Sequence, residues 1–468
     1  MAVRSPDRPA RERLLRFGEP VPQRFTRAAL AGLALCLALS GVGCRQDDDA
    51  TKSSKTGDAD TQMKNGGATT PSQESQAAAA AQTETIKQLS AMGYLDFSED
   101  KADKDRIGVV LNVREKYSPG YNLYSAPSLS SAFLIDQDGK VIQSWKHEHS
   151  RHWTYCELFP NGDLLVPGMN PFEDRDPDEE SNRYLLRLSW DGKVIWKRRI
   201  SAHHDVELTP NGKILTLTDE YSLRPIHRRL LTRDTPPTLL SQDGQVIGEL
   251  SLYDAFDASP AVFKMKVEGI QRIRRGVKRS IDLFHANSIE WMPHKSLAST
   301  HAIYSPSNVL VCLRHQNAVA ILNWDDKKLL WAWGPGELLG PHDASMLPSG
   351  HILIFDNGFT RGWSRVIELD PLARRIVWEY KAPTPADFYT ITRGGAQRLP
   401  NGNTLITNSN SGQAFEVTPE GERVWEFLSP HLNDEGYRAT IVRMNRYEPD
   451  YIDRILRSHA PADLPRAP

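Results

Sequence analysis

The sequence predicts an all-β fold, a six-bladed β-propeller, and two repeated signals and their spacing support this prediction. The first signal is a unit in which a residue is followed six positions later by a proline, then by a turn and an apolar strand. The five copies span 154–166, 204–216, 287–299, 342–354 and 394–406. The third copy lacks the turn glycine and fits the unit least well.

The second signal is an apolar run, a turn rich in Gly or charge, and a strand that usually carries a tryptophan. A short turn rich in Asp and Gly between two alternating β-forming segments is typical of a β-hairpin. Six such hairpins are found, at 134–145, 187–196, 239–250, 321–333, 366–380 and 414–427.

The spacing of the hairpins predicts the blades. When the five tryptophans and Gly248 are aligned, the intervals between them are 51, 52, 83, 47 and 47 residues. A period near fifty with about four short strands per unit is typical of a propeller blade. The long interval predicts an insertion of about thirty residues. A β-sandwich or an open array is the alternative, but repeated blades bury their faces only when they stack.

Six hairpins but only five proline units indicate that one blade takes its inner strands from elsewhere. We expect these strands from 106–113 and 121–126, which would tie the two ends of the chain together and hide the sheet edges. The predicted propeller covers 106–430, with a helical insertion at about 253–284 and a C-terminal extension over 431–468.

The N-terminal segment predicts export. A basic stretch precedes the apolar run 28–43, which is short for a membrane span but suits a signal peptide. Small residues before Cys44 resemble a lipobox, so we expect a lipoprotein signal over 1–43 and lipidation of Cys44; an uncleaved anchor is the alternative. The composition of 44–85 is too polar for folding, so we expect a disordered tether there. We expect a short helical segment over 86–105. The expected location is the bacterial cell envelope, facing the periplasm.

Composition excludes some function classes. The 57 basic and 59 acidic residues nearly balance, so nothing favours a nucleic-acid partner. Cys156 and Cys312 are expected to be buried free thiols, with a disulfide between them as the alternative. The chain has no CxxC or HExxH motif, so we predict neither a metal site nor a cofactor.

Blade equivalence predicts a common pocket, because residues two apart on a strand share a face. When the five units are aligned on their proline, equivalent positions should form rings at one end of the axis. The first ring holds Thr154, His204, Asn287, His342 and Gly394. Two residues upstream stand His152, Ala202, His285, Gly340 and Thr392, and in the next strand stand Met169, Asp219, Arg314, Asn357 and Ser409.

The pocket predicted by these rings combines imidazoles with an arginine. Neutral imidazole is a nucleophile near neutral pH, and Arg or imidazolium stabilises oxyanions through charge-assisted hydrogen bonds. Without a metal, such a set suits transfer of a sulfuryl or phosphoryl group. A single histidine in a repeat is more often structural, and Asp205 and Asp343 suit turns. We expect ordinary packing or surface roles for His203, His294, His301, His315 and His351.

Several segments resemble the bacterial arylsulfotransferase family: HHDVELTPNG (203–212), FHANSIEW (284–291), NVLVCLRHQNAV (308–319), GPHDASMLPSG (340–350) and RGGAQRLPNGNTLI (393–406). The resemblance covers roughly 107–427. It implies a six-bladed envelope propeller that moves a sulfuryl group from a phenolic sulfate ester to a phenol, by a ping-pong mechanism through a sulfohistidine.

The resemblance also implies roles for individual residues. His342 would be the nucleophile, and Arg314 and His204 would bind the sulfuryl oxygens. His285 would bind sulfate or exchange a proton with the phenolic oxygen, with Asn287 beside it. Thr392 matches a hydroxyl at the site, and the ring alignment adds His152 as a substrate-binding candidate.

The chain departs from the family pattern in three ways. It lacks a close cysteine pair and a large N-terminal β-domain, and it carries the basic insertion 255–284 before His285. We therefore predict an aryl-sulfate sulfotransferase whose partners are small aryl sulfates and phenols, held at the membrane by its lipid. The alternatives are a non-catalytic propeller that binds an anionic ligand or a partner protein, and a hydrolase in the same pocket. The sequence does not determine the oligomeric state.

Overall fold

The computed structural model describes residues 96–171, 173, 182–227, 229–267, 272–275 and 278–460. The chain divides into two units, Met1–Thr70 and Pro71–Pro468, and every described residue belongs to the second. The signal peptide, the tether and the lipidation of Cys44 predicted above lie outside the described residues. No helix of the described part is long and apolar enough to cross a membrane.

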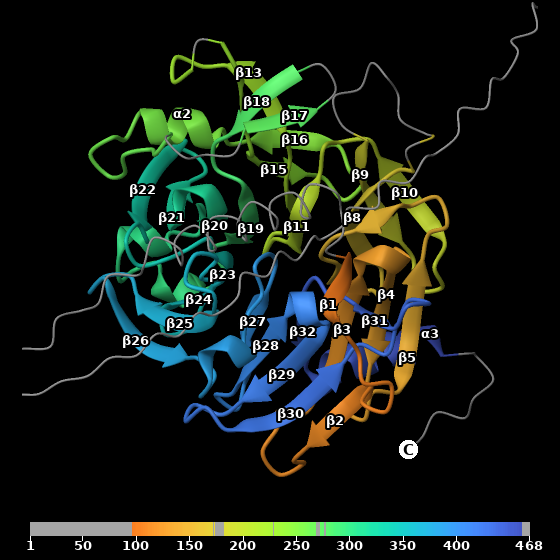
Figure 1. Ribbon diagram of the computed structural model, residues 1–468. Coiled ribbons are helices and arrows are strands. Elements are labelled where there is room, and N and C mark those ends of the chain that lie inside the picture. The colour runs from red at the N-terminus through yellow and green to blue at the C-terminus, as the bar shows by residue number, and fades with distance from the viewer. Residues whose placement is uncertain are drawn as a thin grey trace, which may run out of the picture. The chain divides into compact units, whose positions relative to one another are not determined.

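The described part is dominated by antiparallel strands, as Figure 1 shows. Six sheets of four or five strands follow one another along the chain. The first sheet contains β3 (Tyr121–Ala126), β4 (Ser131–Ile135), β5 (Val141–Lys146) and β32 (Met444–Tyr447); the second contains β6 (His152–Trp153), β7 (Glu157–Leu158), β8 (Leu164–Met169), β9 (Arg183–Leu188) and β10 (Val194–Arg198); the third contains β11 (His203–Leu208), β12 (Ile214–Leu217), β15 (Pro237–Leu240) and β16 (Val246–Glu249). The fourth contains β19 (Ala286–Trp291), β20 (Asn308–Leu313), β21 (Ala318–Asn323) and β22 (Lys328–Trp333); the fifth contains β23 (His342–Met346), β24 (Ile352–Asp356), β25 (Arg365–Asp370) and β26 (Arg375–Tyr380); the sixth contains β27 (Gly395–Arg398), β28 (Thr404–Asn408), β29 (Gln413–Val417), β30 (Arg423–Leu428) and β2 (Gly108–Asn112).

Two smaller groups of strands and a few helices complete the described part. An additional four-stranded sheet contains β13 (Glu220–Leu223), β14 (Leu231–Asp234), β17 (Arg272–Arg275) and β18 (Lys278–Asp282), and β1 (Phe97–Lys101) pairs with β31 (Tyr437–Ala439). The α-helices are α2 (Leu252–Asp257) and α3 (Pro449–His459), and the 3-10 turns are η2 (Pro127–Leu129), η3 (Lys295–Leu297), η4 (Ala302–Tyr304), η5 (Arg314–Gln316), η6 (Pro385–Asp387) and η7 (Ser409–Ser411).

The tryptophans of five hairpins join their sheet to the next, whereas the third hairpin carries Gly248 at this position. Their indole N–H groups donate to backbone carbonyls in the following sheet, a repeated contact that satisfies a polar group inside an apolar interface. The pairs are Trp145 to Ser189, Trp196 to Gln242, Trp331 to Pro371, Trp378 to Pro419 and Trp425 to Gln137. The last pair joins the sixth sheet to the first.

Both ends of the chain contribute strands to the sheets, but not as the sequence analysis expected. The strand β3 does lie in the sheet of the first hairpin, where it pairs with β4. The expected companion strand from 106–113 does not: β2 pairs instead with β30, at the outer edge of the sixth sheet. The missing inner strand is β32, which pairs with β3 and comes from the segment expected to be an extension.

The helical predictions were only partly correct. Among the described residues of the insertion expected to be helical over about 253–284, α2 is the one helix, capped by the Ser251 hydroxyl, which accepts the backbone N–H of Asp254. The strands β17 and β18 follow it, and β18 pairs with β14 in parallel. Similarly, β1 replaces the helix expected within 86–105 where the structure describes it. The strands β17 (RIRR) and β18 (KRSID) were not predicted because their run of basic residues was taken for the solvated face of a helix.

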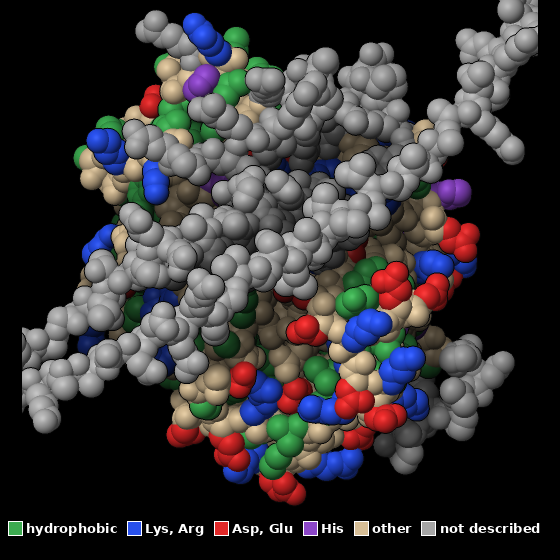
Figure 2. Space-filling model, in the orientation of Figure 1, with side chains coloured by type: hydrophobic (Ala, Val, Ile, Leu, Met, Phe, Trp, Pro, Cys, Tyr) green, Lys and Arg blue, Asp and Glu red, His purple; other side chains and the backbone are tan. Residues whose placement is uncertain are grey.

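The core is divided among the sheet interfaces. One cluster joins the third and fourth sheets around Leu217, Phe284 and Val311, and another joins the fourth and fifth around Cys312 and Ile354. Cys156 and Cys312 are both buried free thiols, as expected. Over the sheets at the bottom of Figure 2, Asp and Glu side chains are interspersed with Lys and Arg, in keeping with the balanced charge of the chain.

Candidate active site

A repeated cross-link sets the equivalent positions in three consecutive sheets. In the first strand of each sheet, a side-chain oxygen accepts a backbone N–H of the next sheet: Asp205 from Ile289, Ser288 from Ala344 and Asp343 from Ala396. The residues immediately before these acceptors are His204, Asn287 and His342. The structure therefore places these three side chains at equivalent positions, as the alignment on proline predicted. Asp205 and Asp343 link sheets and do not simply form turns.

The backbone is strained at this point of each repeat. The strands β11, β19 and β23 each carry a bulge, and His204, His285, Asp343 and Arg393 have φ values of 60°, 46°, 45° and 61°. A left-handed conformation is costly for residues other than glycine and is concentrated at functional sites, where it directs a side chain.

His342 is held in one tautomer by Asn357, at the end of β24. The Asn357 amide nitrogen donates to the carbonyls of Thr390 and Arg393, at 2.8 and 2.7 Å, so its oxygen must face His342. That oxygen lies 2.6 Å from Nδ1 of His342. Nδ1 therefore carries the proton and donates it, and Nε2 carries the lone pair. The backbone N–H of Arg393 lies 3.2 Å from Nε2.

The same surroundings keep His342 neutral. Burial lowers the pKa of His342 well below its ordinary value, and the positive charge of Arg314 lowers it further; the hydrogen bond to Asn357 acts in the opposite direction. An uncharged imidazole with its lone pair on Nε2 is a nucleophile at neutral pH once a substrate replaces the Arg393 N–H that faces this nitrogen.

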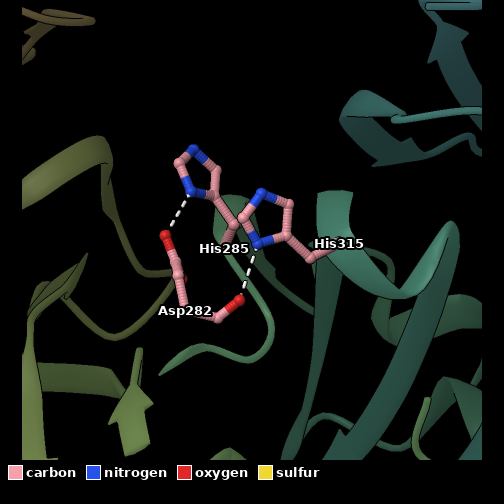
Figure 3. A group of neighbouring side chains, drawn as sticks. All are labelled: Asp282, His285 and His315. Atoms are coloured by element: carbon pink, nitrogen blue, oxygen red, sulfur yellow. Dashed lines mark hydrogen bonds and ion pairs between the residues drawn. The ribbon is translucent and has the colours of Figure 1, made fainter. Parts of the chain in front are cut away.

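His285 and His315 lie side by side and share one partner, Asp282, as Figure 3 shows. Nδ1 of His285 lies 2.6 Å from the carboxylate Oδ2 of Asp282, and Nδ1 of His315 lies 2.7 Å from its backbone carbonyl. A carbonyl only accepts, so Nδ1 of His315 is the donor. The two ring centroids are 4.6 Å apart. Burial lowers the pKa of His285 to about 3, although the Asp282 carboxylate opposes this shift.

His204 is oriented by a chain of two further residues. Nδ1 of His204 lies 2.6 Å from Nδ1 of His203, and Nε2 of His203 faces both the Thr218 carbonyl at 3.2 Å and Asp219 at 3.1 Å. Since Nε2 of His203 has only acceptors before it, it carries the proton and Nδ1 of His203 accepts from His204. The ring of His204 lies 5.0 Å from that of His285.

Buried ion pairs connect these histidines to the additional sheet. Arg233, on β14, pairs with Asp219 at 2.5 Å and with Asp282, at the end of β18, at 2.6 Å; Arg183 pairs with Asp219 at 3.0 Å. These groups are almost fully excluded from solvent. Burial would raise the pKa of both carboxyls, but the neighbouring cations hold the pKa of Asp219 and Asp282 well below the usual range. The insertion thus supplies Asp282, which orients His285 and His315, whereas Asp219, the partner of His203, lies between β12 and β13.

Arg314 stands at the start of η5, immediately after β20, and its backbone N–H donates to the His285 carbonyl. Its positive charge contributes to the lowered pKa of both His342 and His285. Within the described ranges it makes a cation–π contact with Phe359 and no side-chain hydrogen bond. Asn287 donates from Nδ2 to the Pro341 carbonyl at 2.9 Å, and its buried Oδ1 has no partner among the described residues.

Two residues predicted to bind substrate, His152 and Thr392, have no direct contact with the histidine cluster among the contacts of the described residues. His152 faces Asp96 at 3.6 Å, and Asp96 in turn pairs with Arg393. His152 is therefore linked to His342 only through the Arg393 backbone, not by direct contact. Thr392 precedes Arg393, and its carbonyl accepts a hydrogen bond from the Thr390 hydroxyl.

Sequence reasoning missed His203 and His315, which were expected to be ordinary packing residues, and Asp282. Their signal was adjacency: His203 precedes His204, His315 follows Arg314, and Asp282 stands three residues before His285. Asn357 and Asp219 were present in the ring alignment, but their roles as orienting partners depend on contacts that spacing does not show. The sequence analysis predicted no metal site, but Asp282, His285 and His315 each offer a ligand atom. These three atoms lie within 4.8 Å of one another.

These contacts define a class: an all-β protein with a buried cluster of imidazoles and an arginine where its first strands begin. The profile of the arylsulfotransferase (ASST) family matches residues 184–429, more than half of the chain. The chain therefore belongs to the arylsulfotransferase family. A search of curated protein sequences gave no match.

Solved structures with similar folds are distant, and propeller proteins are among them. A Bacteroides caccae protein of unknown function has a TM-score of 0.44 and 15% identity, over 70% of this chain and 98% of its own. A periplasmic gluconolactonase from Pseudomonas aeruginosa has a TM-score of 0.40 and 12% identity, over 71% of this chain and 100% of its own. A β-propeller domain from Myceliophteria thermophila has a TM-score of 0.38 and 11% identity, over 70% and 87%. Similarity at this level does not bear on activity.

Proposed function

We propose that this protein is a six-bladed β-propeller and an aryl-sulfate sulfotransferase in which His342 receives the sulfuryl group. The observation that carries the proposal is the tautomer of His342: Asn357 fixes the proton on Nδ1, so the lone pair is on Nε2. The six sheets, joined at five of their six junctions by tryptophan hydrogen bonds, support the blade count, and family membership supports the reaction type.

In the first half of the reaction, the His342 Nε2 lone pair attacks the sulfur of an aryl sulfate. The Nε2–S bond forms as the bond from sulfur to the aryl oxygen breaks, and the electron pair leaves with the phenolate. Arg314 lies close enough to stabilise negative charge on the sulfuryl oxygens, and the Arg393 N–H that now faces Nε2 is a second donor. Because the pKa of His285 is only about 3 in the empty site, a donor with a stable phenolate is favoured.

In the second half, a phenol attacks the sulfuryl group on His342. Its oxygen forms the new S–O bond while the Nε2–S bond breaks and the imidazole recovers its lone pair. The phenolic proton must go to a base, and Nε2 of His285 is suitable because Nδ1 already faces Asp282. The low pKa of His285 then returns the proton to solvent. The sum of both halves consumes one sulfate ester and one phenol, and yields the other ester, a phenolate and a proton.

The test is turnover of 4-nitrophenyl sulfate with phenol as acceptor. We expect nitrophenolate release by the protein and a loss of at least about 1,000-fold in His342→Ala, because no other group supplies the nucleophile. Mass spectrometry of protein quenched with donor alone should find one sulfuryl group on the peptide that carries His342. The matched control is His351→Ala: His351 bonds Glu368 and should leave release unchanged.

The alternatives give different outcomes. Release that persists in His342→Ala would overturn the assignment of the nucleophile. Saturable binding of an aryl sulfate without turnover or labelling would favour a non-catalytic binding propeller. Release that requires water alone, with no sulfated phenol formed, would indicate a hydrolase.

We further propose that the protein is a lipoprotein of the bacterial envelope, anchored through Cys44. The support is the apolar run 28–43 with small residues before Cys44. Cells expressing the protein should incorporate labelled fatty acid into it, and Cys44→Ala should lose the label and leave the membrane fraction. Membrane association that survives this substitution would indicate an uncleaved anchor instead.

A further inference from the structure

Three imidazoles in the site present an unoccupied nitrogen to their surroundings. His204, His285 and His315 each have Nδ1 engaged, with His203, the Asp282 carboxylate and the Asp282 carbonyl respectively. None of the three has a partner at Nε2 among the described residues, which include all fourteen histidines of the chain. In Figure 3 the Nε2 atoms of His285 and His315 point the same way, away from Asp282.

This pattern differs from that of a purely structural histidine. His203, in the same region, has both ring nitrogens engaged, and Nε2 of His342 faces the Arg393 N–H. A histidine that binds a metal instead gives one ring N–H to a carboxylate or a carbonyl and keeps the other nitrogen for the ion. Asp282 provides both kinds of partner at once, the carboxylate for His285 and the carbonyl for His315.

The charge at Asp282 also suits a cation. Arg233 and His285 both contact Oδ2 of Asp282, and its buried Oδ1 has no hydrogen-bond partner among the residues the structure describes. The arginines act in the opposite direction: Arg233 contacts Asp282 at 2.6 Å, and Arg314 directly precedes His315 in η5, so both bring positive charge to this group. A cation here must therefore be held by coordinate bonds to imidazole nitrogen. Calcium and magnesium prefer oxygen ligands, so these bonds favour a transition metal.

We propose that His285 and His315 bind a zinc-class divalent cation through Nε2, with His204 as the third ligand and a water in the fourth position. The ring of His285 lies 4.6 Å from that of His315 and 5.0 Å from that of His204, so it neighbours both. Three nitrogen ligands with one open position are a common zinc environment. The inference goes beyond the proposed transfer reaction, but it has a consequence that rests on it: a metal on Nε2 of His285 removes the base that accepts the phenolic proton, so zinc inhibits transfer.

The test is a titration of the purified full-length protein with Zn²⁺ in competition with a chromogenic chelator, without any sulfate ester. We expect one zinc per chain, and at least about 10-fold weaker binding in His285→Ala and in His315→Ala, as is usual when a metal contact is lost. The matched control is His351→Ala, because His351 has a carboxylate partner, Glu368, but no second imidazole beside it. Arg314→Met should tighten binding, because it removes a positive charge.

Two outcomes would overturn the proposal. One is the absence of stoichiometric zinc binding by folded protein. The other is binding that survives His285→Ala and His315→Ala but is lost in His149→Ala, which would place the metal at the pair His147 and His149, whose rings are 6.2 Å apart. Folding of each variant is checked by its thermal unfolding, and the electronic spectrum of the Co²⁺ complex reports nitrogen ligation directly. Since no substrate is present, the result does not depend on whether the protein transfers sulfate.

Discussion

At the scale of single residues, the candidate site depends on partners that select one tautomer. Asn357 is the clearest case, because two backbone carbonyls fix its amide group and leave only its oxygen for His342. The carboxylate Asp282 and the relay from Asp219 through His203 act in the same way on His285 and His204. Each of these partners is more deeply buried than the histidine it orients or equally buried, so its geometry is rigid.

Replacement of Asn357 tests this view. Asn357→Leu keeps the approximate volume but removes the acceptor, so Nδ1 of His342 is no longer held and the ring loses its direction. We expect a fall of about 100-fold in nitrophenolate release, the usual cost of misplacing a reacting group by a small distance. If Asn357→Leu shows this fall in release but keeps the thermal stability of the native protein, the result supports a positioning role for Asn357.

The control is Asn357→Asp, which keeps an acceptor at the same place and adds a negative charge. This charge should raise the pKa of His342, so release in this variant should fall as the pH is lowered, at a pH where the native protein is unaffected. A pH profile of kcat/KM measures the shift. Identical profiles in the two proteins would mean that Asn357 does not contact His342 during the reaction.

At the scale of elements, the bulged first strands have two roles, which adjacent residues fill. One residue belongs to the site, and the next links its sheet to the following one. The bulge includes His204 in β11 and follows His342 in β23, and the next residue, an aspartate in both cases, reaches the following sheet. Arg443 lies between the two aspartates, at 3.3 Å from Asp205 and 3.2 Å from Asp343. A change at the link between sheets should therefore alter stability and the position of His342 together.

Two substitutions of Asp343 separate the contribution of its hydrogen bond to the Ala396 N–H from that of its ion pair with Arg443. Asp343→Ala leaves the Ala396 N–H unpaired and removes one partner of the buried Arg443, which should destabilise the protein by about 3 kcal/mol, the lower range for breaking a buried ion pair. Asp343→Asn keeps an oxygen for the Ala396 N–H and loses only the charge, so it should cost less. Urea unfolding measures both; equal losses would mean that the N–H contact contributes nothing.

The repeat allowed the elements and part of the site to be predicted, because symmetry converts spacing along the chain into proximity in space. His204, Asn287 and His342 were found in this way, and the sheet-to-sheet hydrogen bonds confirm their equivalence. The insertion lies outside the repeat, so its strands and Asp282 could not be placed by symmetry. The pairing of β32 with β3 could not be found either, because contacts between the two ends of a chain leave no local pattern.

At the scale of the whole described unit, both ends of the chain stabilise the closing contact between the sixth and first sheets. Arg446, on β32, forms a buried ion pair with Glu416 of the sixth sheet, and it also donates to Asn122 of the first sheet. The Trp425 indole donates to the Gln137 carbonyl across the same boundary. One arginine near the C-terminus thus joins strands about 300 residues apart in sequence.

The carboxyl groups on the first strands should make stability depend on pH. Burial raises the pKa of Glu157 to about 7 and that of Glu290 to about 8, and it raises the pKa of Glu207 well above its ordinary value. The folded state therefore holds protons on these groups that the unfolded chain has already released. Their contribution to stability is complete below the unfolded pKa of about 4.5 and is lost as the pH rises through the folded values.

The histidines act in the opposite direction over a different range. The pKa of His285 is lowered to about 3 and that of His203 to about 4, so their contribution is complete above about pH 6.5 and is lost toward acid. Between about pH 6.5 and 8 the effect of these histidines comes to an end, while the carboxyls of Glu157, Glu207 and Glu290 still change their protonation. We therefore expect the free energy of unfolding to fall across this interval, by at most about 1.4 kcal/mol per pH unit for each carboxyl.

Glu290→Gln tests the assignment because glutamine imitates the protonated carboxyl and cannot lose a proton. One oxygen of Glu290 accepts the backbone N–H of Met346, at 2.5 Å, and the amide oxygen of glutamine can do the same. Urea unfolding of the native protein and the variant at several pH values should show a shallower decline in the variant. Glu379→Gln, whose carboxyl lies at the surface on β26, is the control and should leave the slope unchanged. A native protein whose stability does not change between about pH 6.5 and 8 would mean that these carboxyls are ionised in the folded state.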